Sequence, residues 1–155
     1  MVLDEHPELA HGSRAAIRDA GLARLQEADA RTRAAAVSLV VLVRDPSAPT
    51  AAVDALDDQS PRVRVRGLLG VFLLKPPGCL PRVLGLLDDE DTNVRSFAAG
   101  ALERVGDATS VAVLSEARAR ERDPGVRDRI DETLAILEGR RPPTPIEPSI
   151  WEEAE

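Results

Sequence analysis

The feature that most constrains this sequence is a short motif that occurs four times at nearly constant spacing. In each copy an Asp or Ser is followed by two variable residues, a Val or Thr, and an Arg. The four arginines are Arg33, Arg64, Arg95 and Arg127, spaced by 31, 31 and 32 residues. Such a period is typical of proteins that stack one small structural unit on the next. We therefore expect an array of four similar units.

Apolar residues on both sides of each motif have helical spacing. In the second copy Val53 and Leu56 precede the motif, and Val71 and Leu74 follow Arg64. Separations of three, four and seven residues place side chains on one face of an α-helix. Each unit should therefore be a pair of helices, with the Asp or Ser of the motif capping the second. The expected helices cover residues 13–27, 30–44, 49–57, 61–74, 78–88, 92–105, 108–120 and 124–138.

The composition fits an all-α fold. Aromatic residues make up only 2% of the chain and Tyr is absent, so the core must consist of Leu, Val, Ile and Ala. Ala and Leu are strong helix formers, whereas sheets favour Thr and aromatic residues. We predict a right-handed α-solenoid of four hairpins and about eight helices, without a sheet. In the second helix of the second unit, the expected core residues are Val63, Gly67, Gly70, Val71 and Leu74.

The third unit carries a family resemblance. Residues 86–107 read Leu-Leu-Asp-Asp-Glu-Asp-Thr-Asn-Val-Arg-Ser-Phe-Ala-Ala-Gly-Ala-Leu-Glu-Arg-Val-Gly-Asp, which resembles a HEAT repeat of the short type found in bilin lyases. The resemblance covers roughly residues 13–139, and the fourth unit departs from it by lacking the Leu-Asp-Asp sequence. It implies a scaffold or adaptor that binds proteins and is not an enzyme. The alternative is a lyase-like or regulatory subunit of an enzyme complex.

The recurring arginines form a ladder that could be mistaken for an anion-binding site. The resemblance implies that they bond to acidic residues between neighbouring hairpins, and we expect Asp57 and Asp88 to be their partners. A structural residue recurs with the repeat, whereas a catalytic residue is needed once. The ladder is therefore predicted to be structural.

Charge and composition divide the chain into three parts. These are a flexible N-terminal segment (1–12), the solenoid (13–139), and a Pro-rich acidic tail (140–155). The net charge is −7, of which the first part contributes −3 and the tail −2. A nearly neutral body is a poor match for nucleic acid or for an anionic membrane surface. No secretory signal or membrane-spanning run is evident, so the expected location is the cytoplasm.

No residues form a convincing catalytic or metal site. His6 and His11 lie near acidic residues, but we expect a solvated segment there and predict neither metal nor cofactor. Cys79 begins a predicted helix, where a thiol can be activated, yet a packing role is the better interpretation. A HEAT-like DNA glycosylase would need a basic face with aromatic residues, which this sequence does not offer. A bilin lyase would need a bilin-binding site, and no motif in the sequence indicates one.

The second helices also predict a binding surface. Opposite the core of the second unit lie Val65, Leu69 and Phe72, with Val41 from the first unit beside them. Further along the row the corresponding face turns acidic. The residues there are Glu103, Asp128 and Glu132. We expect a protein or peptide partner, with basic residues at one end; other occupants are a second copy, as in a homodimer, or the chain's own tail. The alternative is that Leu69 and Phe72 only pack against adjacent helices and have no role in binding.

The tail has an uneven composition. Four prolines between residues 142 and 148 favour an extended backbone. One interpretation is a flexible acidic tail. The other is that Ile146, Ile150 and Trp151 anchor it on the solenoid or on a partner, because Trp is a frequent anchor at interfaces.

Overall fold

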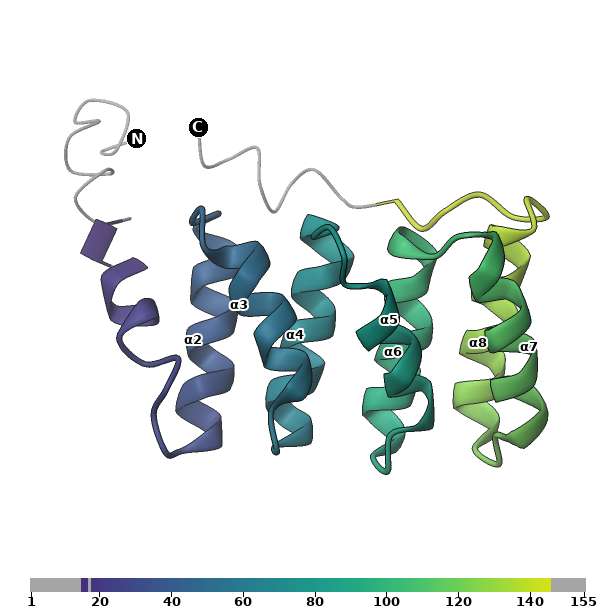
Figure 1. Cartoon of the computed structure of the whole chain (residues 1–155), viewed down its shortest axis with the longest axis horizontal. Helices are drawn as coiled ribbons and strands as arrows, with labels where there is room; N and C mark the ends of the chain where they lie inside the picture. Colours follow the sequence, from purple (N-terminus) through teal and green to yellow (C-terminus); the bar gives the residue numbers. More distant parts are fainter. Residues whose placement is uncertain (1–14, 17, 146–155) are drawn as a thin grey trace.

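The computed structural model describes residues 15–16 and 18–145, and these form a row of helical hairpins (Figure 1). After helical turns at 18–22, the helices are α2 (Ala30–Leu42), α3 (Ala48–Asp54), α4 (Pro61–Leu74), α5 (Leu80–Gly85), α6 (Thr92–Val105), α7 (Ala108–Arg120) and α8 (Pro124–Leu137). Two 3-10 turns extend α3 and α5. They are η1 (Ala55–Asp57) and η2 (Leu86–Asp88). No strand occurs in the described part of the chain, which confirms the all-α solenoid.

The motif residues cap the second helices as the sequence predicts. The side chain of Asp29 accepts a hydrogen bond from the backbone N–H of Thr32, and Asp123 does the same for Val126. Asp91 accepts from two backbone N–H groups at the start of α6. Ser60 is extended but makes no such bond, and Pro61 begins α4 instead. Proline fits the first helical position because its missing N–H has no helical partner there.

The hairpins stack mainly through their second helices. α2 packs on α4, α4 on α6, and α6 on α8, while α3, α5 and α7 each pack on the second helix of their own hairpin. Contacts among α3, α5 and α7 themselves are sparse. The second helices therefore form the continuous row, as expected from the repeat. Among the described helices none combines the length and the apolar character needed to cross a bilayer.

The core runs through the stack in two clusters of small aliphatic residues. The larger extends from Leu56 to Leu134, and the smaller joins α2 to α3 and α4. The structure confirms the expected core of α4. Val63, Gly67, Gly70 and Val71 are buried, and Leu74 is partly buried. Two glycines on one face bring α4 close to α3, so the hairpin is tightly packed.

Cys79 lies within this core. Its residue surface is 2% exposed, and burial raises the pKa of its thiol. A raised pKa lowers the thiolate fraction at neutral pH, which opposes nucleophilic reactivity. The predicted packing role is consistent with both facts.

We expect the Cys79 thiol to be protected from a disulfide reagent such as dithionitrobenzoate at pH 8. The reaction should be at least about tenfold slower in the folded protein than in urea, because both access and thiolate formation are restricted. Absorbance at the reagent's product wavelength measures both rates. Equal rates in buffer and in urea would show that this thiol is not in the core.

Candidate binding surface

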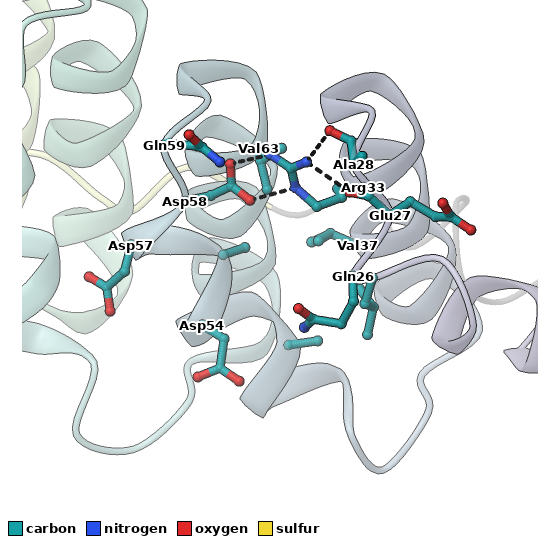
Figure 2. Close-up of a pocket in the computed structure, with 13 residues that line it drawn as sticks. Gln26, Glu27, Ala28, Arg33, Val37, Asp54, Asp57, Asp58, Gln59 and Val63 are labelled. Carbon is teal, nitrogen blue, oxygen red and sulfur yellow. Dashed lines mark hydrogen bonds and ion pairs between the residues drawn. The ribbon is translucent and has the colours of Figure 1, made fainter.

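The arginines of the first three motifs each pair with an acidic side chain of the next hairpin. Arg33 makes two parallel bonds to Asp58: its Nε and Nη2 donate to the two carboxylate oxygens, each at 2.8 Å. Its Nη1 donates to the backbone carbonyls of Glu27 and Ala28, each at 2.8 Å (Figure 2). One guanidinium thus joins the turn of its own hairpin to the turn of the following one.

The same link recurs along the stack. Arg64 Nη2 donates to Asp89 at 2.8 Å, and Arg95 makes two bonds to Glu121, at 2.7 and 3.1 Å. In the fourth hairpin Glu121 therefore takes the place of the missing Asp. Arg127, in the last motif, donates to the backbone carbonyl of Glu121 at 2.7 Å. These contacts support the predicted structural role of the arginines.

The predicted acidic partners were wrong by one residue. Asp57 points away from Arg33 in Figure 2, and it pairs instead with Arg82 at 3.3 Å. Asp88 likewise pairs with Arg120 at 2.8 Å, and all four of these side chains are exposed. The second Asp of each pair faces the arginine, and it also accepts a turn hydrogen bond: Asp58 from the N–H of Ser60 and Asp89 from the N–H of Asp91.

The pairing changes the titration of the acids. Hydrogen bonds from Arg95, with further bonds from the N–H groups of Asp123 and Arg122, hold the pKa of Glu121 at about 2. The hydrogen bond from Arg33 holds the pKa of Asp58 below its usual value. Arg33 and Arg95 are thus each neutralised by a carboxylate that stays ionised, and Arg64 is paired with Asp89. These three arginines offer no free charge for an anionic ligand.

The predicted apolar binding residues differ in their exposure and in whether they belong to the core. Val41 is only 5% exposed and belongs to the smaller core cluster, so it is not available to a partner. Val65 is half-buried and packs partly on the larger cluster. Leu69 and Phe72 are half-buried and belong to neither cluster. The guanidinium carbon of Arg104 lies 5.4 Å from the centre of the Phe72 ring, a cation–π contact.

The three acids at the predicted acidic end of the surface lie in different surroundings. Glu103 is only 7% exposed, and it accepts hydrogen bonds from the backbone N–H and the hydroxyl of Thr144. Glu132 is paired with Arg129 at 3.1 Å and with Arg141 at 3.7 Å. Asp128 is exposed on α8. The expectation of a partner with basic residues rested on these three acids, of which only Glu132 is in an ion pair.

Two open hollows lie on either side of α4, and apart from the predicted Val65 and Leu69 their lining residues were not among the predicted binding residues. Their shared feature is an arginine rim around apolar side chains. The hollow between α2 and α4 is lined by Arg31, Ala34, Ala35, Ser38, Leu39, Leu42, Arg62 and Arg66. The hollow between α4 and α6 is lined by Pro61, Arg62, Val65, Arg66, Leu69, Asp91, Asn93 and Phe97. We call the surface formed by these two sets the α4 face.

The α4 face combines exposed apolar groups with unpaired positive charge. Leu42 is 52% exposed and Phe97 is 39% exposed. Arg62 and Arg66 are exposed, and no carboxylate of the described residues lies within salt-bridge distance of them. Their spacing of four residues, with Leu69 three further on, is a signal that the sequence did contain. An apolar surface bordered by arginines is typical of contact sites.

Between α6 and α8 the same row is closed. The guanidinium of Arg129 lies over Gly100, where a side chain would approach it to 2.7 Å. The hydroxyl of Thr133 donates to the backbone carbonyl of Ala99 at 3.0 Å and is fully buried. These contacts fill the space that remains open between α4 and α6. The accessible part of the row is therefore the α4 face.

Other predicted site residues cannot be placed. Trp151, Ile146 and Ile150, like His6 and His11, lie outside the described residues. Within the described ranges, no group of His, Cys, Asp and Glu side chains is arranged to hold a metal ion.

Comparison with known proteins agrees with the geometry. The sequence model described as HEAT repeats matches residues 49–135, which covers α3 to α8. A search of curated protein sequences gave no match. The matched range is more than half of the sequence and contains three of the four motif arginines, the second helices α4, α6 and α8, and the hollow between α4 and α6. On this ground the chain belongs to the HEAT-repeat family.

Proposed function

We propose that this protein is an interaction module that binds an acidic, partly apolar segment of another protein on the α4 face. HEAT repeats generally mediate protein–protein interactions, and their fold is typically a non-catalytic scaffold. The observation that carries the proposal is the coincidence of exposed Leu42 and Phe97 with Arg62 and Arg66, which have no acidic partner in the described structure. Elsewhere on the row Arg33, Arg64 and Arg95 are paired with carboxylates, and Arg129 is paired with Glu132.

The chemistry of the face indicates the kind of ligand. Leu69 and Phe97 line one side of α4 and Leu42 the other, so an apolar side chain can lie in either hollow. Arg62 and Arg66 border both hollows, and guanidinium groups bind carboxylates through paired hydrogen bonds. An extended or helical peptide with Asp or Glu beside Leu, Ile, Phe or Trp satisfies both features.

Selection of random displayed peptides on the immobilised full chain tests this proposal. We expect enrichment of acidic sequences with large apolar residues, and loss of at least about tenfold in affinity for the double variant Arg62→Glu/Arg66→Glu. The variant Leu69→Ser should also weaken binding, with little change in the unfolding midpoint, because Leu69 lies outside both core clusters.

The matched control is Arg82→Glu/Arg122→Glu, which makes the same change in net charge on other parts of the molecule. Arg82 makes only an exposed pair with Asp57, and the Arg122 side chain is exposed. This control should bind the selected peptides as the wild type does. Enrichment of basic peptides, or equal binding to both double variants, would contradict the proposal.

A further inference from the structure

The last described residues return along the stack toward its middle. After α8 the chain turns back, and the backbone N–H groups of Arg140 and Arg141 donate to the carbonyl of Ala135. The segment then crosses to α6, as Figure 1 shows. There the hydroxyl of Thr144 donates to Glu103 at 3.0 Å, and its backbone N–H donates to the other oxygen of the same carboxylate. Pro145 is thereby held beside α6.

The point of attachment is on the same row of side chains as the α4 face. Glu103 on α6 corresponds in the repeat to Phe72 on α4, 31 residues earlier. Arg104, next to Glu103, stacks on Phe72 and so connects the two helices. Its Nε is buried, and no described residue accepts a hydrogen bond from it. A buried donor of this kind is normally satisfied, so a carboxylate is expected nearby.

The ten residues that follow Pro145 complement the α4 face in composition. They contain four Glu and no basic residue, together with Ile146, Ile150 and Trp151. Glu147 comes two residues after Pro145 in the sequence, so only about 6 Å of extended chain separates it from the segment held beside α6. Glu152 and Glu153 directly follow the Trp, as acidic groups beside an apolar anchor. This is the ligand chemistry that the proposed function requires.

The length of this segment matches the distance. Packed helix axes lie about 8–10 Å apart, so α2 is roughly 20 Å from α6 across the row. An extended chain advances about 3.1 Å per residue in the conformation that proline favours. Trp151, six residues beyond Pro145, can therefore lie about 19 Å away, which is far enough to reach the hollows on either side of α4.

We propose that residues 146–155 dock on the α4 face of their own chain, with Ile150 and Trp151 in its hollows and Glu152 and Glu153 against Arg62 and Arg66. The inference rests on the proposed function, since it assigns to the same surface an internal ligand. An external partner must then compete with the segment for the same surface. Thr144 and Glu103 hold its starting point in register.

Trp151 is the sole Trp, so its fluorescence reports on this segment in the full chain. At low salt we expect emission at clearly shorter wavelength than in urea, because a docked indole is shielded from water. Arg62→Glu/Arg66→Glu should shift the emission to that of the unfolded chain without lowering the thermal midpoint measured by circular dichroism. Arg82→Glu/Arg122→Glu should leave the emission unchanged.

Three results would overturn the inference. They are wild-type emission equal to that of the unfolded chain, no effect of Arg62→Glu/Arg66→Glu, and a short-wavelength emission that disappears on dilution together with a dimer in sedimentation. The last would mean that a second copy occupies the face.

Peptide selection on Trp151→Ser separates this inference from the proposed function. If the segment docks, the selected acidic peptides should bind this variant roughly tenfold or more tightly than the wild type, because an attached ligand competes at high effective concentration. Equal binding to both proteins, with Trp151 exposed, would leave the proposed function standing and reject the docking. If the Trp151 emission showed a shielded indole but no peptide were selected, the docking would stand and the proposed function would be rejected.

Discussion

Replacing Gly67 by alanine is expected to destabilise the protein by about 2 kcal/mol, although alanine is the better helix former. A methyl group at this position would lie 2.7 Å from the backbone oxygen of Ala52, 3.0 Å from Cβ of Ala55 and 3.1 Å from Cδ2 of Leu56. A backbone oxygen cannot rotate away, so α3 would have to move off α4. Urea unfolding followed by circular dichroism measures the loss.

The matched control is Gly85→Ala at the end of α5. Gly85 has helical backbone angles, and a methyl group there would meet nothing within 4 Å. This change should stabilise the protein by up to about 1 kcal/mol, because it removes the conformational freedom of glycine without a clash. A Gly67→Ala protein as stable as Gly85→Ala would show that α3 and α4 are not packed as closely as described.

The second large effect is expected at Glu121. Its pKa is about 2 in the folded protein against 4.5 for a free glutamate, so the folded state favours the ionised form. The resulting stability, about 3 kcal/mol, is fully present above pH 4.5 and is lost as the pH falls toward 2. Glu121→Gln should remove this stability at pH 7 and flatten the dependence of the unfolding free energy on pH between 4.5 and 2.

The paired control for this experiment is Glu116→Gln on α7. Glu116 is exposed and lies 3.9 Å from Arg120, a geometry that contributes little in water. Its replacement should change the unfolding free energy by less than about 0.5 kcal/mol at any pH. If the two variants behaved alike in urea titrations at pH 3 and pH 7, Arg95 would not depend on Glu121 for its charge partner.

The repeat in the sequence was sufficient to predict the hairpins, because each helix carries its own apolar period and its own cap. The identity of the salt-bridge acids was not accessible in the same way. Asp57 and Asp58 are adjacent and equally acidic, and only the turn geometry decides that Asp58 faces Arg33. Periodicity locates a residue to within one position, which is about 100° on a helix.

The same limit explains the error at the binding surface. Val41 was predicted on the exposed side of α2, whereas its neighbour Leu42 is the exposed residue. The bond between Thr144 and Glu103 could not be predicted at all, because it joins residues 41 positions apart with no periodic signal. The arginines of the α4 face were visible in the sequence, but their lack of partners is a property of the folded chain.

The arginine pairs have a direction with consequences for synthesis. Arg33, Arg64 and Arg95 each bond to an acid 25 or 26 residues later in the chain. Because the N-terminal end of a protein leaves the ribosome first, each hairpin emerges before the carboxylate that neutralises its arginine. During synthesis the most recent hairpin therefore has an arginine without its carboxylate partner. Each ion pair between hairpins can form only after the next repeat has emerged.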